Sequence, residues 1–461
     1  MPYVETVLLY IVGILIVVVG LIVSIGLHEI GHLIPAKAFG VKVGQYMIGF
    51  GPTIFSRTKG ETEYGVKAIP LGGYISMSGM FPPQRTAEVA EDALGAPGEQ
   101  HRVAAGRTAT TGVFQTLVQD ARTASAETVD EGEEQRTFYR LAVPKRIVIM
   151  LGGPVMNLLI AIVLFAVVLC GIGTQQPTTT VGSVSACVLP AGSTETTCPA
   201  GATQSPGAAA GIRAGDRILS IDGTTVSSWD QSTSIIQKSS GQAVDMVVLR
   251  DGARETLEIT PLLTKRYVTD ANGNYVTDSS GAKETEEVGF VGIGSVYERQ
   301  QSPVSAVLPA VGSNIANVGH LILNLPQRLI GVAQAAFGGG ERDPNGPVSV
   351  VGVGRMAGDV ASLNSVPVLD RASVLVGLLS SLNVALFVFN LIPLMPLDGG
   401  HVAGAIIEGV RRFFAKLFGR KDPGPVDTAK VIPLTFAVVA ILGAMSLLLF
   451  YADIVNPISI G

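Results

Sequence analysis

The chain of 461 residues has few charged side chains: Asp, Glu, Lys and Arg make up only 15% of it. An ordinary soluble domain carries about 25% of these residues. Hydrophobic residues account for 47% of the chain, which indicates a membrane protein. The net charge of −5 is small, so the composition does not favour a nucleic acid as a partner.

Cysteine is also scarce, with three residues in the chain. Cys170 lies inside an apolar run and is interpreted as a packing residue. Cys187 and Cys198 flank a short loop rich in Pro, Gly, Ser and Thr. A disulfide between them is expected if this loop lies outside the cytoplasm, and two unpaired thiols are the alternative.

Long apolar runs, in contrast, are present. Four of them are long enough to cross a bilayer, at about 7–34, 147–172, 373–397 and 431–452. Residues 1–6 contain no Lys or Arg and the first run exceeds the apolar core of a signal peptide, so we expect no cleavage there. Basic residues follow the first run, precede the second and fill the loop between the third and fourth. The positive-inside rule therefore predicts cytoplasmic loops at 35–145 and 399–430, with both termini and 173–370 outside.

The first run ends in His28-Glu29-Ile30-Gly31-His32. On a continuous helix, histidines four residues apart share one face, which is the spacing that two imidazoles need to bind one Zn²⁺. Glu29 is then placed to act as a general base towards water. Ionisable residues at the end of a membrane span are costly and indicate a function. The alternative is a chance match on a buried helix.

A catalytic zinc needs a third protein ligand, and Asp398 at the end of the third run is the candidate. The first and third runs cross in the same direction, which predicts a similar depth for Asp398 and the two histidines. His401 is a competing ligand. Asp398 is preferred because two histidines and one carboxylate leave the open position that catalysis requires. Asn383 is expected to form a hydrogen bond within the bundle, and His320 to be structural.

The regions between the spans differ in texture. Val, Ile, Phe and Tyr alternate with Gly at 41–80, which predicts strands and hairpins. The acidic stretch 82–140 is predicted to be flexible and partly helical towards 128–142. Residues 180–263 predict strands around one helix, and the pattern from Ala210 to Gly223 resembles a PDZ domain. Such domains bind extended peptides by strand addition; a β-domain that acts only as a steric cap is the alternative. The helices expected at 303–337 are too polar for spans and are placed on the outer face.

Together, the histidine motif on the first span, the PDZ-like pattern, and Asn390 to Gly399 at the third span resemble the site-2 protease family of intramembrane zinc metalloproteases, in its bacterial branch with a PDZ domain. The resemblance implies one catalytic Zn²⁺ bound by His28, His32 and Asp398, with Glu29 as the base. It implies that Asn390 and Gly72, Gly73 and Tyr74 of the 41–80 region contact an unwound substrate. The stretch from Leu151 to Asn157 is similar to the family's start of span two.

The expected fold is an α-helical bundle of about four transmembrane helices with a membrane-associated β-hairpin region and an inserted α+β PDZ domain. The expected segments are a first span at 1–40, the hairpin region at 41–80, a flexible cytoplasmic insertion at 81–143, a second span at 144–173, the PDZ domain at 180–263, an outer insertion with surface helices at 264–370, a third span at 371–400, a basic cytoplasmic loop at 401–430 and a fourth span at 431–453. The insertion departs from the shorter bacterial pattern, and one PDZ signature is evident where some relatives have two.

The implied function is regulated intramembrane proteolysis in the inner (plasma) membrane. Expected partners are the lipid bilayer and single-pass membrane proteins, such as anti-sigma factors or remnant signal peptides, after a first cut outside. The PDZ domain is expected either to bind a peptide C-terminus or to act as a size filter. A zinc transporter and an inactive PDZ membrane scaffold are the alternatives; neither needs Glu29 beside His28.

Overall fold

The computed structural model describes residues 2–82, 113–193, 197–268, 283–340, 342–343, 346–426 and 428–458. Residues 83–112, somewhat less than half of the predicted insertion at 81–143, therefore lie outside the described residues. The chain divides into two compact units, which are described separately. Unit 1 comprises Met1–Ile172 and Ser302–Gly461, and unit 2 comprises Gly173–Gln301.

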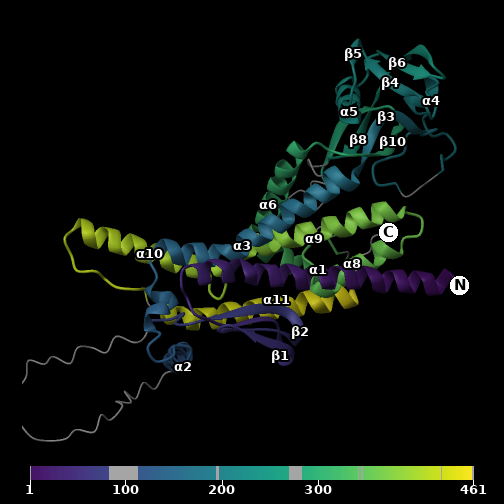
Figure 1. Cartoon of the computed structure of the whole chain (residues 1–461). Coiled ribbons are helices and arrows are strands. Elements are labelled where there is room, and N and C mark those ends of the chain that lie inside the picture. The colour runs from purple at the N-terminus through teal and green to yellow at the C-terminus, as the bar shows by residue number, and fades with distance from the viewer. Residues whose placement is uncertain are drawn as a thin grey trace, which may run out of the picture. The chain divides into compact units, whose positions relative to one another are not determined.

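Unit 1 is mainly helical, and its long helices lie side by side (Figure 1). Helix α1 packs against α3 and α9, and α10 packs against α3. The helices are α1 (Pro2–Ala38), α2 (Val113–Glu127), α3 (Val143–Ala166) with its π-helical continuation η3 (Val167–Ile172), α6 (Val307–Leu323), α7 (Leu325–Gly338), α8 (Val350–Ser362), α9 (Val368–Asn390), α10 (Asp398–Leu417) and α11 (Ile432–Val455). Short 3₁₀ turns are η1 (Glu134–Arg136), η2 (Phe138–Arg140), η4 (Val304–Ala306) and η5 (Thr428–Val431).

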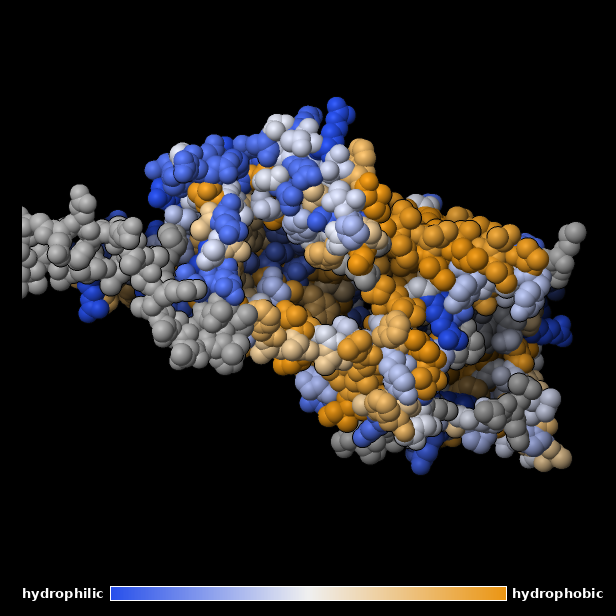
Figure 2. All heavy atoms as spheres, turned by 90° about the horizontal axis from the view of Figure 1, so that it is seen from below, coloured by the Kyte–Doolittle hydropathy of each residue, from blue (hydrophilic) through white to orange (hydrophobic). Residues whose placement is uncertain are grey.

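Among the described residues, five helical segments are long and apolar enough to cross a membrane, so the chain is a membrane protein. They are Tyr3–Ala38, Val143–Ile172, Val304–Leu323, Val368–Asn390 and Thr428–Val455. The sequence predicted about four, and α6 is the addition. Apolar side chains cover a broad part of the surface in Figure 2, as expected where lipid replaces water. Those exposed on α1 include Val7, Leu8, Ile11, Val12, Leu15, Ile16, Val19 and Val23.

The third predicted span is interrupted. Helix α9 ends at Asn390, residues 391–397 form turns, and α10 begins at Asp398. The prediction that Asp398 lies at the end of the span 371–400, followed by a loop at 401–430, was therefore wrong: α10 fills half of that loop. Pro393 and Pro396 lack the amide hydrogen that a continuous helix requires, which explains the break.

The 41–80 region forms a bent hairpin of β1 (Val43–Lys59) and β2 (Thr62–Met77). Met47 of β1 pairs with Tyr74 on one side and with Gly65 on the other. Both partners belong to β2, because each strand bends back near its middle and the two halves of β2 lie on either side of the first half of β1. Gly49, with φ of +94°, allows the bend in β1. The order across the sheet is 73–77, 43–48, 62–67 and 53–59, so within the described residues the segment 73–77 forms an edge.

The predicted helical content near 128–142 is displaced. Helix α2 occupies Val113–Glu127, and only the 3₁₀ turns η1 and η2 follow before α3. The side chain of Ser78, just after the hairpin, donates a hydrogen bond to the Thr128 carbonyl at 2.6 Å. The end of this region is therefore anchored on the hairpin.

Unit 2 is a β-rich domain with strand order β10-β3-β4-β6-β7, with β5 paired to β4 and with a separate β8-β9 pair. Its apolar core includes the fully buried Ile218 and Met246. Cys187 and Cys198 form a disulfide. The elements are β3 (Thr174–Val184), α4 (Pro206–Ala209), β4 (Arg217–Ile221), β5 (Thr224–Thr225), α5 (Trp229–Lys238), β6 (Val244–Arg250), β7 (Ala253–Ile259), β8 (Leu262–Tyr267), β9 (Thr285–Phe290) and β10 (Ile293–Gln300). The domain thus extends past the predicted end at residue 263.

Candidate metal centre

Three side chains of unit 1 converge on one point. Nε2 of His28 lies 3.2 Å from Nε2 of His32, and each of these nitrogens lies 3.3 Å from Oδ2 of Asp398. These residues form a group whose ligand atoms could hold a metal ion. The break before α10 makes this possible, because it places Asp398 at the start of a helix rather than inside one.

The spacing of the three atoms fits zinc. Ligands about 2.1 Å from a tetrahedral zinc ion are about 3.4 Å apart, close to the three observed distances. Oδ2 of Asp398 is buried, and no donor among the described residues forms a hydrogen bond with it. Such an arrangement of acceptor atoms is unfavourable without a cation between them, since a buried polar atom otherwise needs a partner. Two imidazoles and a carboxylate are also a donor set of catalytic zinc sites with an open position.

Helix α3 fixes the orientation of both histidine rings. Nδ1 of His32 lies 2.7 Å from the carbonyl oxygen of Ile149, which makes Nδ1 the protonated nitrogen and leaves Nε2 free to bind a metal. The side-chain amide of Asn157 lies 3.0 Å from Nδ1 of His28. The sequence prediction missed both partners. The sequence could have indicated Asn157, because it is a polar residue in an apolar span, and the structure shows it fully buried. A main-chain carbonyl such as that of Ile149 cannot be recognised from the sequence.

Glycines let α1 and α3 approach closely at this point. A Cβ on Gly31 would lie 2.2 Å from the carbonyl oxygen of Gly152, and one on Gly153 would lie 2.2 Å from Nε2 of His32. Any side chain on Gly153 would therefore displace the histidine rings. The paired glycines explain the local sequence, since small residues are what allow helices to pack this tightly in a membrane.

Glu29 is 9% exposed and faces the hairpin. A Cβ on Gly73 would lie 3.0 Å from Cγ of Glu29, so the edge segment 73–77 begins directly beside this carboxylate. The Tyr46 hydroxyl donates to the Gly26 carbonyl at 2.8 Å and so ties the hairpin to α1.

For Gly72, Tyr74 and Asn390, the other predicted substrate-binding residues, the structure gives no contact with Glu29 like that of Gly73. Gly72 has φ of +130°, and a Cβ added there would lie 2.5 Å from the ring of Phe50. Tyr74 donates to Oε1 of Gln45 at 3.1 Å and stacks on Phe50. Asn390 is the last residue of α9. Their roles stay predictions.

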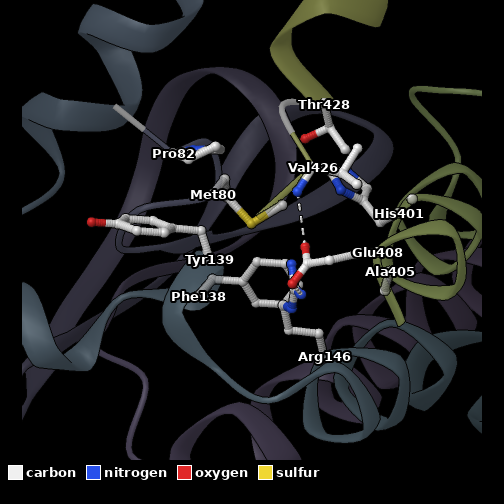
Figure 3. A pocket seen from close by; sticks show the side chains of 11 residues that line it. Met80, Pro82, Phe138, Tyr139, Arg146, His401, Ala405, Glu408, Val426 and Thr428 are labelled. Atoms are coloured by element: carbon white, nitrogen blue, oxygen red, sulfur yellow. Dashed lines mark hydrogen bonds and ion pairs between the residues drawn. The ribbon is translucent and has the colours of Figure 1, made fainter. Parts of the chain in front are cut away.

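His401, the competing ligand, is not part of the converging group. It lines a separate cavity of about 20 Å³, together with Arg146 and Glu408 (Figure 3). Asn383 is fully buried, and its amide donates to the Ser24 hydroxyl at 3.0 Å, which confirms the predicted hydrogen bond within the bundle.

A motif of two histidines and an aspartate, with a buried glutamate beside them in a helical membrane unit, defines a zinc-dependent membrane hydrolase. The family model for peptidase family M50 matches residues 16–421. The chain therefore belongs to this family, the site-2 proteases, and is a zinc metalloendopeptidase with a catalytic zinc.

Curated relatives agree with this assignment. The chain is 32% identical to the zinc metalloprotease Rip1 of Mycobacterium tuberculosis over 464 residues, which is 98% of this chain and 99% of that relative. It is 31% identical to Rip1 of Mycolicibacterium smegmatis over 470 residues, with coverage of 97% and 98%. It is 28% identical to the metalloprotease MmpA of Caulobacter vibrioides over 417 residues, with coverage of 87% and 88%. The family membership favours a protease over the transporter and scaffold alternatives.

Proposed function

We propose that the chain cleaves peptide bonds of single-pass membrane proteins within the membrane, with His28, His32 and Asp398 as zinc ligands and Glu29 as the general base. The observation that carries the proposal is the triangle of ligand atoms 3.2–3.3 Å apart, formed beside the buried Glu29. A transporter would need the ligands but not a buried carboxylate packed between them and a strand edge.

Each residue of the proposed site has its own role in the hydrolysis of a peptide bond. When bound, zinc supplies a Lewis acid that polarises the scissile carbonyl and makes water a nucleophile near neutral pH. Glu29 accepts the proton of the attacking water and returns it to the leaving amine. Ile149 and Asn157 hold the rings of His32 and His28 in the tautomer that keeps each Nε2 available.

The hairpin edge offers a place for the substrate backbone. A helical substrate must unwind to expose a peptide bond, and its freed backbone groups then need partners that lipid cannot provide. The segment 73–77 is a strand edge that begins beside Glu29, so strand addition would bring the substrate to the base. Gly72, Gly73 and Tyr74 would line this path, and Asn390 would bind an unwound carbonyl. Anti-sigma factors and remnant signal peptides, trimmed beforehand by a first cut outside, are the proposed substrates.

The proposed site supports one orientation in the membrane. His32 lies near the end of α1 and Asp398 follows α9, and they meet, so α1 and α9 run in the same direction. An odd number of crossings must separate them. Helix α3 is one crossing. If α6 also crossed, the number would be two, and α9 would run opposite to α1. We infer that α6 does not cross, that both termini and unit 2 lie outside the inner membrane, and that the site lies near the cytoplasmic side.

This orientation has a direct test. Asp230→Cys in unit 2 and Lys421→Cys after α10 each place one thiol at an exposed position. In intact cells, a membrane-impermeant maleimide should label the thiol at 230 and should reach the thiol at 421 only after lysis. The opposite pattern would exclude the orientation. The disulfide in unit 2 is consistent with an oxidising outer compartment.

Unit 2 has a groove suited to a peptide. It measures about 170 Å³ and lies between α5 and residues 288–293, with Arg266 and Trp229 among its lining residues. Next to it, β10 forms one end of the described strand order, as peptide capture by a PDZ domain requires. The guanidinium of Arg266 suits a C-terminal carboxylate. A fluorescent peptide with a free C-terminus should bind and its amidated form should not; a failure of both would favour the size filter.

The decisive experiment compares the substitution of the proposed base with that of a proposed zinc ligand, in both cleavage and zinc content. Glu29→Gln should abolish cleavage of a single-pass reporter in the reconstituted protein but retain zinc by elemental analysis. His28→Ala should lose both zinc and cleavage. Cleavage by Glu29→Gln at the wild-type rate would rule out the proposed mechanism.

A further inference from the structure

Helix α10 carries the proposed ligand Asp398 at its first residue, and a buried carboxylate sits ten residues further along. The side chain of Glu408 is 1% exposed. It lies 2.5 Å from the Arg146 guanidinium of α3 and 3.0 Å from that of Arg412, and it accepts a hydrogen bond from the Val426 amide at 3.0 Å. Figure 3 shows Glu408, Arg146 and Val426 around the cavity that His401 also lines.

Arg146 lies on the face of α3 that holds both histidines. The buried residues of this face include Arg146, Ile149, Gly153 and Asn157. Their spacing of three to four residues puts them on one stripe of the helix. Ile149 and Asn157 contact His32 and His28, and Gly153 lies against both rings. A single stripe of α3 therefore contacts two metal ligands directly and the helix of the third through Glu408.

We propose that Glu408 is a positioning residue, which acts through Arg146 to hold α10, and with it Asp398, in register with the two histidines. This inference rests on the proposed ligand set. A buried charge without its partner is strongly unfavourable, so the loss of either member should shift α10 relative to α3 rather than leave the pair in place.

Unit 1 offers a matched control. Arg342 and Asp453 form another buried ion pair, with both side chains 2% exposed. This pair ties α11 to the segment before α8, since Asp453 also accepts from the Ser349 amide. It contacts none of the three proposed ligands. Asp453→Asn and Glu408→Gln therefore remove the same charge from two buried ion pairs at different places.

The test measures zinc affinity by chelator competition on the reconstituted full chain. Glu408→Gln should weaken zinc binding about tenfold, in the range for residues that orient metal ligands, and excess zinc should restore cleavage. Asp453→Asn should leave zinc affinity unchanged. The double variant Arg146→Gln/Glu408→Gln, which removes both charges of the buried pair, should recover part of the loss. If Glu408→Gln does not fold, Arg146→Lys should show a smaller loss. Unchanged zinc affinity in a folded Glu408 or Arg146 variant, or equal losses in the Glu408 and Asp453 variants, would overturn the proposal.

The opposite face of α10 carries a second, independent feature. Large apolar side chains there are 49–69% exposed: Ile406, Ile407, Val410, Phe413, Phe414, Leu417 and Phe418. Their spacing forms one continuous helical stripe. Arg411 and Lys416 flank it, Arg420 and Lys421 follow the helix, and all four are exposed. Within the described residues, no carboxylate forms an ion pair with these four cations.

We infer that this face binds the membrane surface through anionic lipid headgroups. An apolar stripe bordered by basic residues inserts into the boundary between acyl chains and headgroups, and each cation near an anionic surface adds attraction. Long Lys and Arg side chains can reach the headgroups while their stems cover the apolar face. Charge complementarity favours anionic lipid over a neutral lipid or an apolar protein surface.

The test places a fluorophore at Phe413→Cys in a Cys170→Ser background, in lipid nanodiscs of phosphatidylcholine. A small fraction of brominated phosphatidylglycerol should quench the label more than the same fraction of brominated phosphatidylcholine. Arg411→Gln/Lys416→Gln should abolish this difference, whereas Lys238→Gln/Arg254→Gln in unit 2 should not. Equal quenching by both lipids in the labelled protein that keeps Arg411 and Lys416 would show that the face contacts lipid without preferring anionic headgroups. No quenching would show that water or protein covers the face. Either result would overturn the inference.

Discussion

The side-chain amide of Asn157 lies 3.0 Å from Nδ1 of His28, the ring nitrogen that does not face Asp398. When Nε2 binds a metal, Nδ1 carries the proton, so the amide must present its oxygen to the ring. Rotating the amide by 180° provides this arrangement, and the Asn157 oxygen has no other partner in the described part of the chain. Asn157 is thus expected to fix the tautomer of His28 and the plane of its ring.

Asn157→Leu should therefore weaken zinc binding by about 10- to 100-fold, because the ring loses the acceptor that fixes its tautomer. Chelator competition on the purified protein measures this. Asn383→Leu is the control, since Asn383 is equally buried but bonds to Ser24 and to the Leu379 carbonyl. Equal zinc affinity in the two variants would contradict the role of Asn157.

Gly153→Ala should abolish zinc binding, because the added methyl group would lie 2.2 Å from Nε2 of His32 and would force the ring aside. Gly377→Ala in α9 is a matched control, as its methyl group meets no atom within 4 Å. It should also be slightly more stable, since Ala is the better helix former. Elemental analysis of both proteins measures the zinc content. Full zinc content in Gly153→Ala would show that the rings are free to move away without loss of the site.

Acid should weaken unit 2 through Asp216. Burial alone would raise the pKa of its carboxyl, but hydrogen bonds from Arg250 at 2.6 and 2.7 Å and from the Arg213 amide outweigh this and hold the pKa below its ordinary value. A carboxyl with a lowered folded pKa stabilises the fold above its unfolded pKa, about 3.9. This contribution is lost as the pH falls through the folded value.

Arg250→Gln should consequently lower the free energy of unfolding of unit 2 by about 2 kcal/mol at pH 7, and the difference should shrink as the pH falls below about 4. Trp229 is the only tryptophan and packs on the core of unit 2, so its fluorescence reports this unfolding in the full chain. Arg254→Gln, an exposed cation on β7, is the control. A difference that persists unchanged at pH 3 would exclude Asp216 as the titrating group.

The sequence indicated the proposed metal ligands more clearly than the chain path that brings them together. Helical spacing alone places His28 and His32 on one face, and a costly carboxylate after an apolar run indicated Asp398. The turn at 391–397 was missed because Leu391, Ile392 and Leu394 continue the apolar run, and hydropathy does not distinguish a helix from an apolar turn. Only the two prolines signalled the break.

The contacts around the centre were less predictable. The hydrogen bond of His32 goes to a main-chain carbonyl, which any residue at position 149 would supply. The close packing of Gly31 on Gly152 depends on how two distant helices cross. The place of β10 in the unit 2 sheet was also hard to predict, because β10 follows a polar stretch and pairs with β3, more than a hundred residues earlier.

Because Gly73 lies beside Glu29, a substitution at this glycine should affect cleavage without affecting zinc binding. A methyl group at Gly73 would lie 3.0 Å from Cγ of Glu29 and 3.1 Å from the Met47 carbonyl, so Gly73→Ala should push either the base or the strand edge out of place. Cleavage should fall by about tenfold or more, as expected when a catalytic group is misplaced by a fraction of an ångström to 1 Å. Zinc content should not change, because no ligand is touched. Gly443→Ala in α11, where a methyl group meets no atom within 4 Å, is the control for both measurements. A loss of zinc in Gly73→Ala would mean that the hairpin supports the ligands rather than the base, and full activity would mean that Glu29 and the edge do not cooperate.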